Sequence, residues 1–359
     1  MKNIPNKLAA LGFDPSLLES VPPDTLEHFS IAKIAAVHKD SYIVTDGENS
    51  LSAELIGKIL FNASSPLDYP AVGDWVLASF YDDDTLAIIH EILPRKSLLK
   101  RKTPGKKVDF QLIAANIDVA FIVQSLNENF NLRRLERYLV MVNEAEIQPV
   151  VLLSKSDLLD EAEIAIRITE IHSIAPQLKV IPFSSENGFG LDAIREMMLP
   201  GQASCLLGSS GVGKTTLLNA LLGEAKYATK TVSSKESKGR HATTHRQLIR
   251  LDSGAMIVDT PGMRELGNFS TERGVEETFA EIAALAEQCR FSDCSHVSEK
   301  GCAVLAAVEE GTLPADRYEN YLKMTKESAF HEMSYHEKRR KDKQFARHCK
   351  SVMKQKHRR

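Results

Sequence analysis

Long apolar runs are missing from this chain of 359 residues. No stretch reaches the roughly eighteen consecutive apolar residues that a membrane-spanning helix needs. The first residues, Met1–Pro5, also lack the apolar segment that is typical of a signal peptide. We therefore expect no membrane partner and a location in the cytoplasm. With 43% hydrophobic and 26% charged residues, the composition is that of an ordinary globular protein of two or three domains.

Cysteine is also scarce. The five cysteines form an odd, sparse set, which argues against a disulfide framework. Three of them lie within fourteen residues and follow the pattern Cys289-x4-Cys294-x-His296-x5-Cys302. Three thiolates and one imidazole make a closed tetrahedral set that suits one structural zinc ion and leaves no open position for catalysis. Cys205, in contrast, is expected to be a small core residue in a strand.

The net charge of the chain is only −3, but the charge is unevenly distributed. Residues 335–359 contain eleven Lys or Arg against two acidic residues, a net charge of +9, so the remaining residues carry −12. A basic tail on an acidic body indicates a polyanionic partner such as RNA, although such a tail can also be only a solubilising segment.

The amino-terminal third has the pattern of a small β-barrel. Short alternating apolar segments separated by turn residues fill residues 31–95. An oligonucleotide-binding (OB) barrel fits this size, and a generic small β-domain is the alternative. We expect residues 1–30 to be a weakly structured lead. Residues 96–110 are expected to be an exposed basic linker, which serves either as a solvated hinge or as a contact to a phosphate backbone.

Strands and helices alternate over residues 111–270. This alternation predicts a mainly parallel sheet with helices on both faces, so the fold class is α/β. Residues 271–334 are polar and helical and contain the cysteine cluster, which predicts a helical zinc-binding domain before the basic tail of residues 335–359.

A complete phosphate-loop pattern, G-x-x-x-x-G-K-[ST], occupies residues 208–215 between an apolar strand and an amphipathic helix. The glycines let backbone N–H groups point at phosphates, and the start of the helix adds positive potential. Lys214 is expected to bridge the β- and γ-phosphates, and Thr215 to bind Mg²⁺. The expected phosphate-binding residues are Gly208, Ser209, Ser210, Gly211, Val212, Gly213, Lys214, Thr215 and Thr216.

Two further segments complete the expected nucleotide site. Asp259 ends a short apolar strand, where P-loop proteins hold Mg²⁺, and the N–H of Gly262 is placed to sense the γ-phosphate. The base-selecting segment is expected to be Ser154-Lys155-Ser156-Asp157, which is similar to the Asn-Lys-x-Asp element of GTPases, with Ser184-Ser185 as a second guanine-contacting loop. An Asp that accepts hydrogen bonds from guanine disfavours ATP, because its lone pairs are then left unpaired.

The order of these elements is that of a permuted GTPase. The base-selecting Asp157 and Ser184 precede Gly208, whereas a standard GTPase begins with its phosphate loop. A circular permutation with this cut places the segment after Asp259 at the carboxyl end of the nucleotide domain. A downstream domain is then connected directly to a segment that moves on hydrolysis.

With the barrel, the linker, the four nucleotide elements and the cysteine cluster in this order, the chain resembles the RsgA family over nearly its whole length. The resemblance implies an OB-fold, a central permuted GTPase and a carboxyl-terminal zinc domain. It also implies binding to the small ribosomal subunit and its rRNA, a role in late subunit maturation, and GTP hydrolysis that the subunit stimulates. The cofactors expected are one structural Zn²⁺, and Mg²⁺ with GTP.

Two positions depart from the family pattern. Ser154 stands where Asn is usual, so the link between the base loop and the phosphate loop is expected to be weaker. Ala242 stands where the family often has Thr, which leaves Thr243 or Thr244 as the switch ligand to Mg²⁺.

The residue that activates water is a separate question. Met263 follows the Asp-Thr-Pro-Gly segment where many GTPases have Gln, and methionine cannot orient water by hydrogen bonding. His241 matches a family histidine proposed for this role, so His241 and Lys214 are the expected catalytic residues, while an exposed loop histidine is the alternative for His241.

Three functions compete. The leading prediction is a GTP-hydrolysing, RNA-binding assembly factor that acts as a monomer and exchanges GTP and GDP. A GTP-gated RNA-binding module with incidental hydrolysis is the alternative. A metabolic P-loop kinase is disfavoured by Asp157 and by the permuted order.

Overall fold

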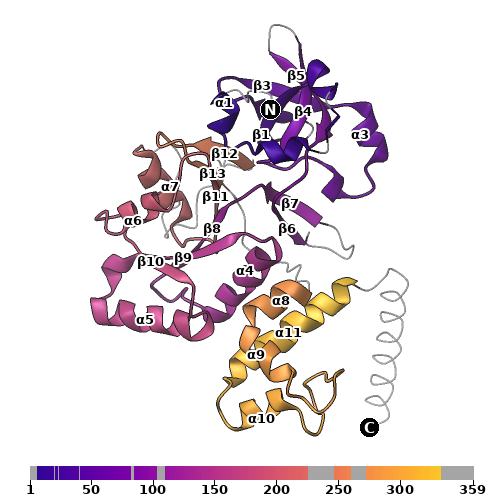
Figure 1. Ribbon diagram of the computed structural model, residues 1–359. Coiled ribbons are helices and arrows are strands. Elements are labelled where there is room, and N and C mark those ends of the chain that lie inside the picture. Colours follow the sequence, from indigo (N-terminus) through magenta and orange to yellow (C-terminus); the bar gives the residue numbers. More distant parts are fainter. Residues whose placement is uncertain are drawn as a thin grey trace, which may run out of the picture. The chain divides into compact units, whose positions relative to one another are not determined.

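Figure 1 shows the computed structural model of the protein. The structure describes residues 6–19, 21–22, 24–39, 41–81, 85–102, 110–224, 246–259 and 272–332. The chain forms two compact units, residues 1–268 and 269–359. None of the helices in the described ranges is long and apolar enough to cross a membrane.

A closed five-stranded barrel occupies the amino-terminal part of the first unit, as the alternating pattern predicts. Its strands are β1 (Ser30–Val37), β2 (Tyr42–Thr45), β3 (Ser50–Leu55), β4 (Trp75–Tyr81) and β5 (Leu86–Ile92), with helix α3 (Gly57–Asn62) between β3 and β4. The strands pair in the order β1-β2-β3-β5-β4, and β4 pairs back onto β1, which closes the barrel. The inward-facing side chains Ile34, Val44 and Ile89 are fully buried in its core.

The first thirty residues are more ordered than the sequence suggests. They contain α1 (Asn6–Ala9), a 3₁₀ turn at Pro15–Leu18 and α2 (Thr25–His28). Leu8, Leu11 and Phe13 are buried, and the ring of Phe13 meets that of Trp75 edge to face at 4.8 Å. The expectation of a weakly structured lead is therefore wrong for the described part of this segment, because its apolar side chains cover the outside of the barrel.

Part of the expected basic linker forms regular secondary structure. Strands β6 (Leu98–Lys102) and β7 (Phe110–Ala115) form an antiparallel pair, and Leu99 is fully buried. Just before them, Arg95 forms a bidentate ion pair with the buried Asp74, with Nε and Nη2 at 2.9 and 2.7 Å from the carboxylate oxygens. Arg95 thus joins the linker to the barrel, and its charge is not available for a phosphate backbone.

A mainly parallel sheet follows, as the strand–helix alternation predicts. Strands β8 (Val119–Ser125), β9 (Gln148–Ser154), β10 (Lys179–Pro182), β11 (Ala203–Leu207) and β13 (Met256–Asp259) are parallel, and β12 (Arg246–Arg250) runs antiparallel to β13. Their order in the sheet is β10-β9-β8-β11-β13-β12.

Helices cover both faces of this sheet. Along β8, Ala120 and Ile122 pack with α4 (Leu132–Glu144) and α5 (Glu161–Ile174), while Phe121 and Val123 pack with α6 (Leu191–Glu196) and α7 (Lys214–Leu222). Successive strand side chains point to opposite faces, and each face buries its own apolar cluster. The uninterrupted apolar composition of β8 follows from this double burial.

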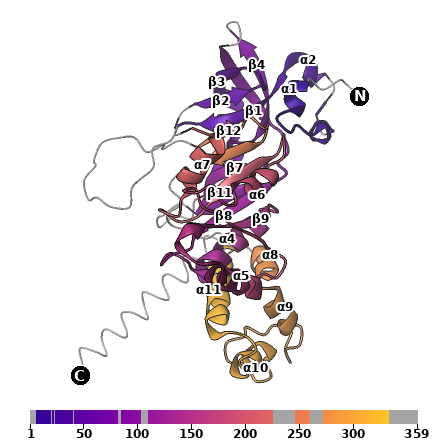
Figure 2. The same ribbon diagram turned by 90° about the vertical axis from the view of Figure 1, so that its left-hand side faces the viewer.

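The barrel and the mainly parallel sheet are joined by hydrogen bonds between one strand of each. Strand β12 pairs antiparallel with β1, with Gln247 opposite Ala36 and Arg246 opposite Val37. Figure 2 shows β12 beside β1 and β2. The two predicted domains are therefore joined by main-chain hydrogen bonds as well as by the linker.

The second unit is helical. Its helices are α8 (Glu272–Thr278), α9 (Ala280–Ala286), α10 (Ala303–Glu309) and α11 (Ala315–Glu332). Phe279 and Met324 are fully buried in it, and the guanidinium of Arg317 lies over the Phe279 ring at 4.8 Å. The Arg317 side chain also donates to Glu281 and, at 3.1 Å, to the Thr278 carbonyl, which ties α11 to α8 and α9. The cysteine cluster lies between α9 and α10.

Candidate nucleotide-binding site and metal centre

The phosphate loop connects the buried strand β11 to helix α7, as its sequence predicts. Gly208 has a φ of +146°, and a Cβ there would lie 2.5 Å from the Val123 carbonyl oxygen, so no other residue fits. Gly213, the residue that caps α7, has a φ of +96°. These two glycines let the backbone curl tightly between the strand and the helix. The first N–H groups of any α-helix lack partners within the helix, so the start of α7 can bind an anion.

Lys214 lies within this loop. Its Nζ donates to the carbonyl oxygens of Gly208 and Ser209, at 2.7 Å each. Burial lowers the pKa of Lys214 to about 8, and the charge of Asp259 opposes that shift. Asp259 ends β13, the strand next to β11, so the predicted Mg²⁺ carboxylate and the predicted phosphate-binding lysine meet at the same edge of the sheet.

Several predicted site residues are brought to this edge, and others lie outside the described residues. Thr215 and Ser210 are exposed, and Thr216 is half-buried, in the first turn of α7 and the loop before it. The described ranges do not include His241, Thr243, Thr244, Gly262 and Met263. Their predicted roles therefore stay predictions.

The predicted base loop follows β9, two strands away from β11. Lys155 has the left-handed backbone conformation, with a φ of +61°, which turns the chain sharply after the strand. Ser156 is buried and its N–H donates to the Phe183 carbonyl at 3.1 Å, whereas the carboxylate of Asp157 is exposed. Within the described ranges, no side chain or backbone group is hydrogen-bonded to this carboxylate. Asp157 thus lies on a hydrogen-bonded loop with its oxygens free to accept hydrogen bonds.

Ser154 connects the base loop to the phosphate loop. Its hydroxyl donates to the Val212 carbonyl at 2.6 Å and lies 3.3 Å from the Gln124 carbonyl. The residue is buried, with 2% of its surface exposed. The short serine side chain thus reaches the phosphate loop directly, and the link between the two loops is present. That this link is weaker than the one made by the usual Asn stays a prediction.

The second predicted guanine loop is compact. Ser184 is fully buried, its N–H donates to the Phe189 carbonyl at 2.9 Å and its hydroxyl accepts from the Glu186 N–H at 3.1 Å. Ser185 is half-buried beside it. The N–H of Phe183 donates to the Leu153 carbonyl at 2.8 Å, so this loop and the base loop leave adjacent strands side by side.

One residue at the phosphate loop was not expected from the sequence. Arg134, in the first turn of α4, donates from Nη1 to the Ser209 hydroxyl at 3.0 Å. The sequence pattern of α4 reports only its apolar face, and a contact across seventy-five positions leaves no local signal.

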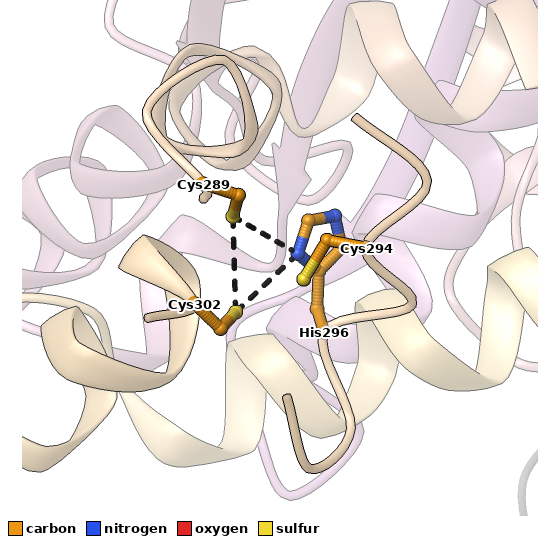
Figure 3. A group of neighbouring side chains, drawn as sticks. All are labelled: Cys289, Cys294, His296 and Cys302. Carbon is orange, nitrogen blue, oxygen red and sulfur yellow. Dashed lines mark hydrogen bonds between the residues drawn. The ribbon is translucent and has the colours of Figure 1, made fainter. Parts of the chain in front are cut away.

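The predicted metal ligands converge in the second unit. One ligand atom from each of Cys289, Cys294, His296 and Cys302 lies within 4.8 Å of all the others (Figure 3). The sulfurs of Cys289 and Cys302 are 3.8 Å apart, and His296 Nδ1 lies 3.6 and 3.5 Å from them.

These distances fit one tetrahedral zinc ion. Zinc–sulfur bonds of about 2.3 Å and zinc–nitrogen bonds of about 2.0 Å place two sulfurs about 3.8 Å apart and a sulfur and a nitrogen about 3.5 Å apart in a regular tetrahedron. The spacing between ligand atoms therefore already matches the metal, and the set can hold one ion without rearrangement of Cys289, His296 and Cys302.

The surroundings orient these ligands. Cys302 caps α10, and its sulfur accepts from the Leu305 N–H at 3.4 Å, which fixes the sulfur at the start of the helix. The Tyr318 hydroxyl donates to the His296 carbonyl at 2.7 Å. The Glu299 carboxylate accepts from the Ser295 side chain and from nearby N–H groups, which lowers the pKa of Glu299 to about 2 and closes the loop between the ligands.

A base loop that precedes the phosphate loop, on one mainly parallel sheet, defines this protein as a circularly permuted GTPase with an attached barrel and a Cys₃His helical unit. A family model described as RsgA GTPase matches residues 92–269. Curated relatives agree over most of the chain, so the chain belongs to the RsgA family of GTPases.

Among these relatives, Small ribosomal subunit biogenesis GTPase RsgA 2 of Lactiplantibacillus plantarum is 45% identical and covers 84% of both chains. The RsgA of Opitutus terrae is 40% identical and covers 90% of both. The RsgA 2 of Vibrio parahaemolyticus is 39% identical and covers 99% of this chain and 95% of the relative.

Two solved structures share the architecture. YjeQ from Thermotoga maritima is 29% identical, with a TM-score of 0.63, over 84% of this chain and 99% of its own. YloQ, described as a circularly permuted GTPase, is 26% identical, with a TM-score of 0.59, over 86% of this chain and 98% of its own. The fold and the permuted order expected from the sequence are therefore confirmed.

Proposed function

We propose that this GTPase binds the small ribosomal subunit and its rRNA, and uses GTP binding and hydrolysis to promote late subunit maturation and its own release. The observation that supports this most is the assembled nucleotide site, in which Ser154 ties the base loop to the phosphate loop. Its relatives are named for biogenesis of the small ribosomal subunit. Such a role also implies a cytoplasmic protein, and we propose that it acts as a monomer.

Each part of the site has a proposed role. Asp157 accepts hydrogen bonds from guanine, with Ser184 and Ser185 as the second wall of the base site. Lys214 contacts the β- and γ-phosphates of GTP. Thr215, one of Thr243 and Thr244, and Asp259 would hold Mg²⁺, which would supply positive charge at the phosphates. The Gly262 N–H senses the γ-phosphate, and His241 orients or deprotonates the attacking water.

The second unit and the tail have supporting roles. We propose that Cys289, Cys294, His296 and Cys302 hold one structural Zn²⁺. The tail of residues 335–359 contributes cations to RNA phosphates, and this binding would weaken steeply as salt rises. Because the second unit follows the Asp259 strand with only a short connection, nucleotide-dependent changes after Asp259 can reach it.

Stimulated turnover distinguishes this function from its alternative. Phosphate release from GTP is expected to be slow for the protein alone and faster by on the order of tenfold or more with purified small ribosomal subunits, since a partner that orders the switch groups stabilises the transition state. His241→Ala should remove most of the stimulated rate and leave GTP affinity nearly intact.

Purified large subunits are the control for this assay and should not stimulate turnover. Equal turnover with and without small subunits, under conditions where the protein binds them, would instead favour a GTP-gated RNA-binding module with incidental hydrolysis. Unchanged stimulated turnover in the His241→Ala variant would exclude that histidine.

Asp157→Ala tests base selection. We expect GTP affinity to fall by about 10²-fold, since two hydrogen bonds to a charged acceptor are lost, while the weak binding of ATP changes little. Competition of GTP and ATP against a fluorescent GTP analogue measures both. Asp192→Ala, at an exposed acidic position on α6, is the matched control and should keep the wild-type preference. A wild-type protein that binds ATP as tightly as GTP would revive the kinase alternative.

A further inference from the structure

Arg134 is an unusual cation for its position. It lies in the first turn of α4, after the N-cap Asn131, where the helix dipole already creates positive potential. The side chain is half-buried, and none of the carboxylates in the described ranges forms an ion pair with it. Its neighbour Arg133, in contrast, pairs with the buried Glu136. A half-buried cation at a helix N-terminus without a counter-ion reduces stability, so the fold by itself does not account for Arg134.

The contacts of Arg134 point to the phosphate loop. Nη1 donates to the Ser209 hydroxyl at 3.0 Å and lies 3.3 Å from the Asn129 carbonyl oxygen. The carbonyl of the same serine accepts from Lys214 at 2.7 Å. Two cations thus bind one phosphate-loop residue: Arg134 of α4 donates to the hydroxyl of Ser209, and Lys214 of α7 donates to its carbonyl.

The base of the Arg134 side chain is itself fixed. The side chain of Asn131 accepts from the Arg134 N–H at 2.8 Å. Asn131 is in turn held by the Gln124 side chain, which accepts from the Asn131 N–H at 3.0 Å and donates to its carbonyl at 3.2 Å. Gln124 is buried near the end of β8, so the turn that carries Arg134 is anchored to the central sheet.

The same strand end anchors a second point of the loop. The Ser154 hydroxyl lies between the Gln124 and Val212 carbonyl oxygens. The phosphate loop is therefore held near its start by Arg134, through Ser209, and near its end by Ser154, through Val212. Between these points lie Ser210 and Gly211, which are exposed and to which no side chain of the described ranges is hydrogen-bonded.

We propose that Arg134 is a positioning residue for nucleotide binding, which holds the first half of the phosphate loop in its binding conformation through Ser209. Preorganisation of this kind raises affinity, because the loop does not have to be ordered when the phosphates bind. The inference rests on the proposed nucleotide site and adds to it a residue from outside the nucleotide-binding motifs.

Titration of a fluorescent GTP analogue into the full-length protein tests the proposal. Arg134→Met keeps the length of the side chain and removes its donors, and it should weaken binding by about tenfold. The midpoint of thermal unfolding without nucleotide should be unchanged or higher, since an uncompensated cation is removed. Ser209→Ala should weaken binding by a similar factor. The double variant should bind within about twofold of either single variant, because both changes remove the same contact.

Arg167→Met is the matched control, since Arg167 lies on the neighbouring helix α5 and pairs with Glu170 at 2.9 Å. Nucleotide affinity of Arg134→Met within about twofold of this control would overturn the proposal. So would a lower unfolding midpoint that accounts for the weaker binding, or losses that multiply in the double variant, which would place Arg134 directly on the phosphates.

If Arg134→Met does not fold, Ser209→Ala alone tests the same contact, and wild-type affinity in that variant would reject the role. Failure of the wild-type protein to bind the analogue would contradict the nucleotide site itself and not only the role of Arg134.

Discussion

Lys214→Met is expected to reduce kcat/KM for GTP hydrolysis by roughly 10²- to 10³-fold. A loss of this size follows when a preorganised donor to the charge that develops in the transition state is removed. The variant should nevertheless unfold at the same temperature or higher without nucleotide, because it no longer buries an ammonium group. Phosphate release and thermal unfolding measure the two effects separately. Lys179→Met, at an exposed lysine on β10, is the control and should change neither.

The pH dependence of GTP binding gives a second test of Lys214. Burial lowers the pKa of this lysine to about 8, and phosphates would favour its charged form. The protonated fraction of Lys214 in the nucleotide-free protein falls through one half near pH 8, so GTP affinity should weaken by about fivefold from pH 8 to 9 and change much less from pH 7 to 7.5. Lys214→Met should lose this component. Equal pH profiles for the two proteins would contradict the assignment.

Removal of a predicted zinc ligand should have a large effect on the folding of the second unit. Cys302→Ser is expected to lose the metal and to disorder the helices around it, since metal binding in small zinc domains contributes on the order of 10 kcal/mol to folding. The residue also caps α10, and a serine hydroxyl can accept the same hydrogen bond from the Leu305 N–H, so the variant removes the metal ligand and keeps the cap. Metal analysis should fall from one zinc per chain toward none, and far-UV circular dichroism should show the loss of helix.

The first unit provides the internal control for that experiment. Binding of a fluorescent GTP analogue should persist in Cys302→Ser, because the phosphate loop belongs to residues 1–268. Cys205→Ala changes a buried cysteine in β11, outside the cluster, and should keep one zinc per chain. A folded, reduced wild-type protein that contains no zinc would refute the metal assignment.

Much of the site could be predicted because its signals are local. The phosphate loop occupies eight consecutive residues, and Gly208 and Gly213 are required there by backbone conformation. The metal ligands lie within fourteen residues, so their spacing restricts the geometry they can form. The apolar periodicity of α4 and its capping residue Asn131 are local signals of the same kind.

The rest could not be predicted, because it depends on contacts between distant segments. Residues 6–19 have too little apolar periodicity to predict a buried segment, yet Phe13 packs against Trp75. Arg95 lies in a basic run that suggests a solvated linker, and only the fold brings Asp74 to it. A charge run specifies composition, whereas the partner of each charge is set by the tertiary structure.

The sequence by itself determined the permuted order of the nucleotide elements, the four predicted metal ligands and the expectation of GTP, because each depends on residue types in local segments of the chain. Only the tertiary structure decided how these elements support one another: Ser154 reaches Val212, Arg134 reaches Ser209, and β12 joins the barrel at β1. The physical reason is that hydrogen bonds between residues far apart in the chain require the folded backbone to bring donor and acceptor within about 3 Å.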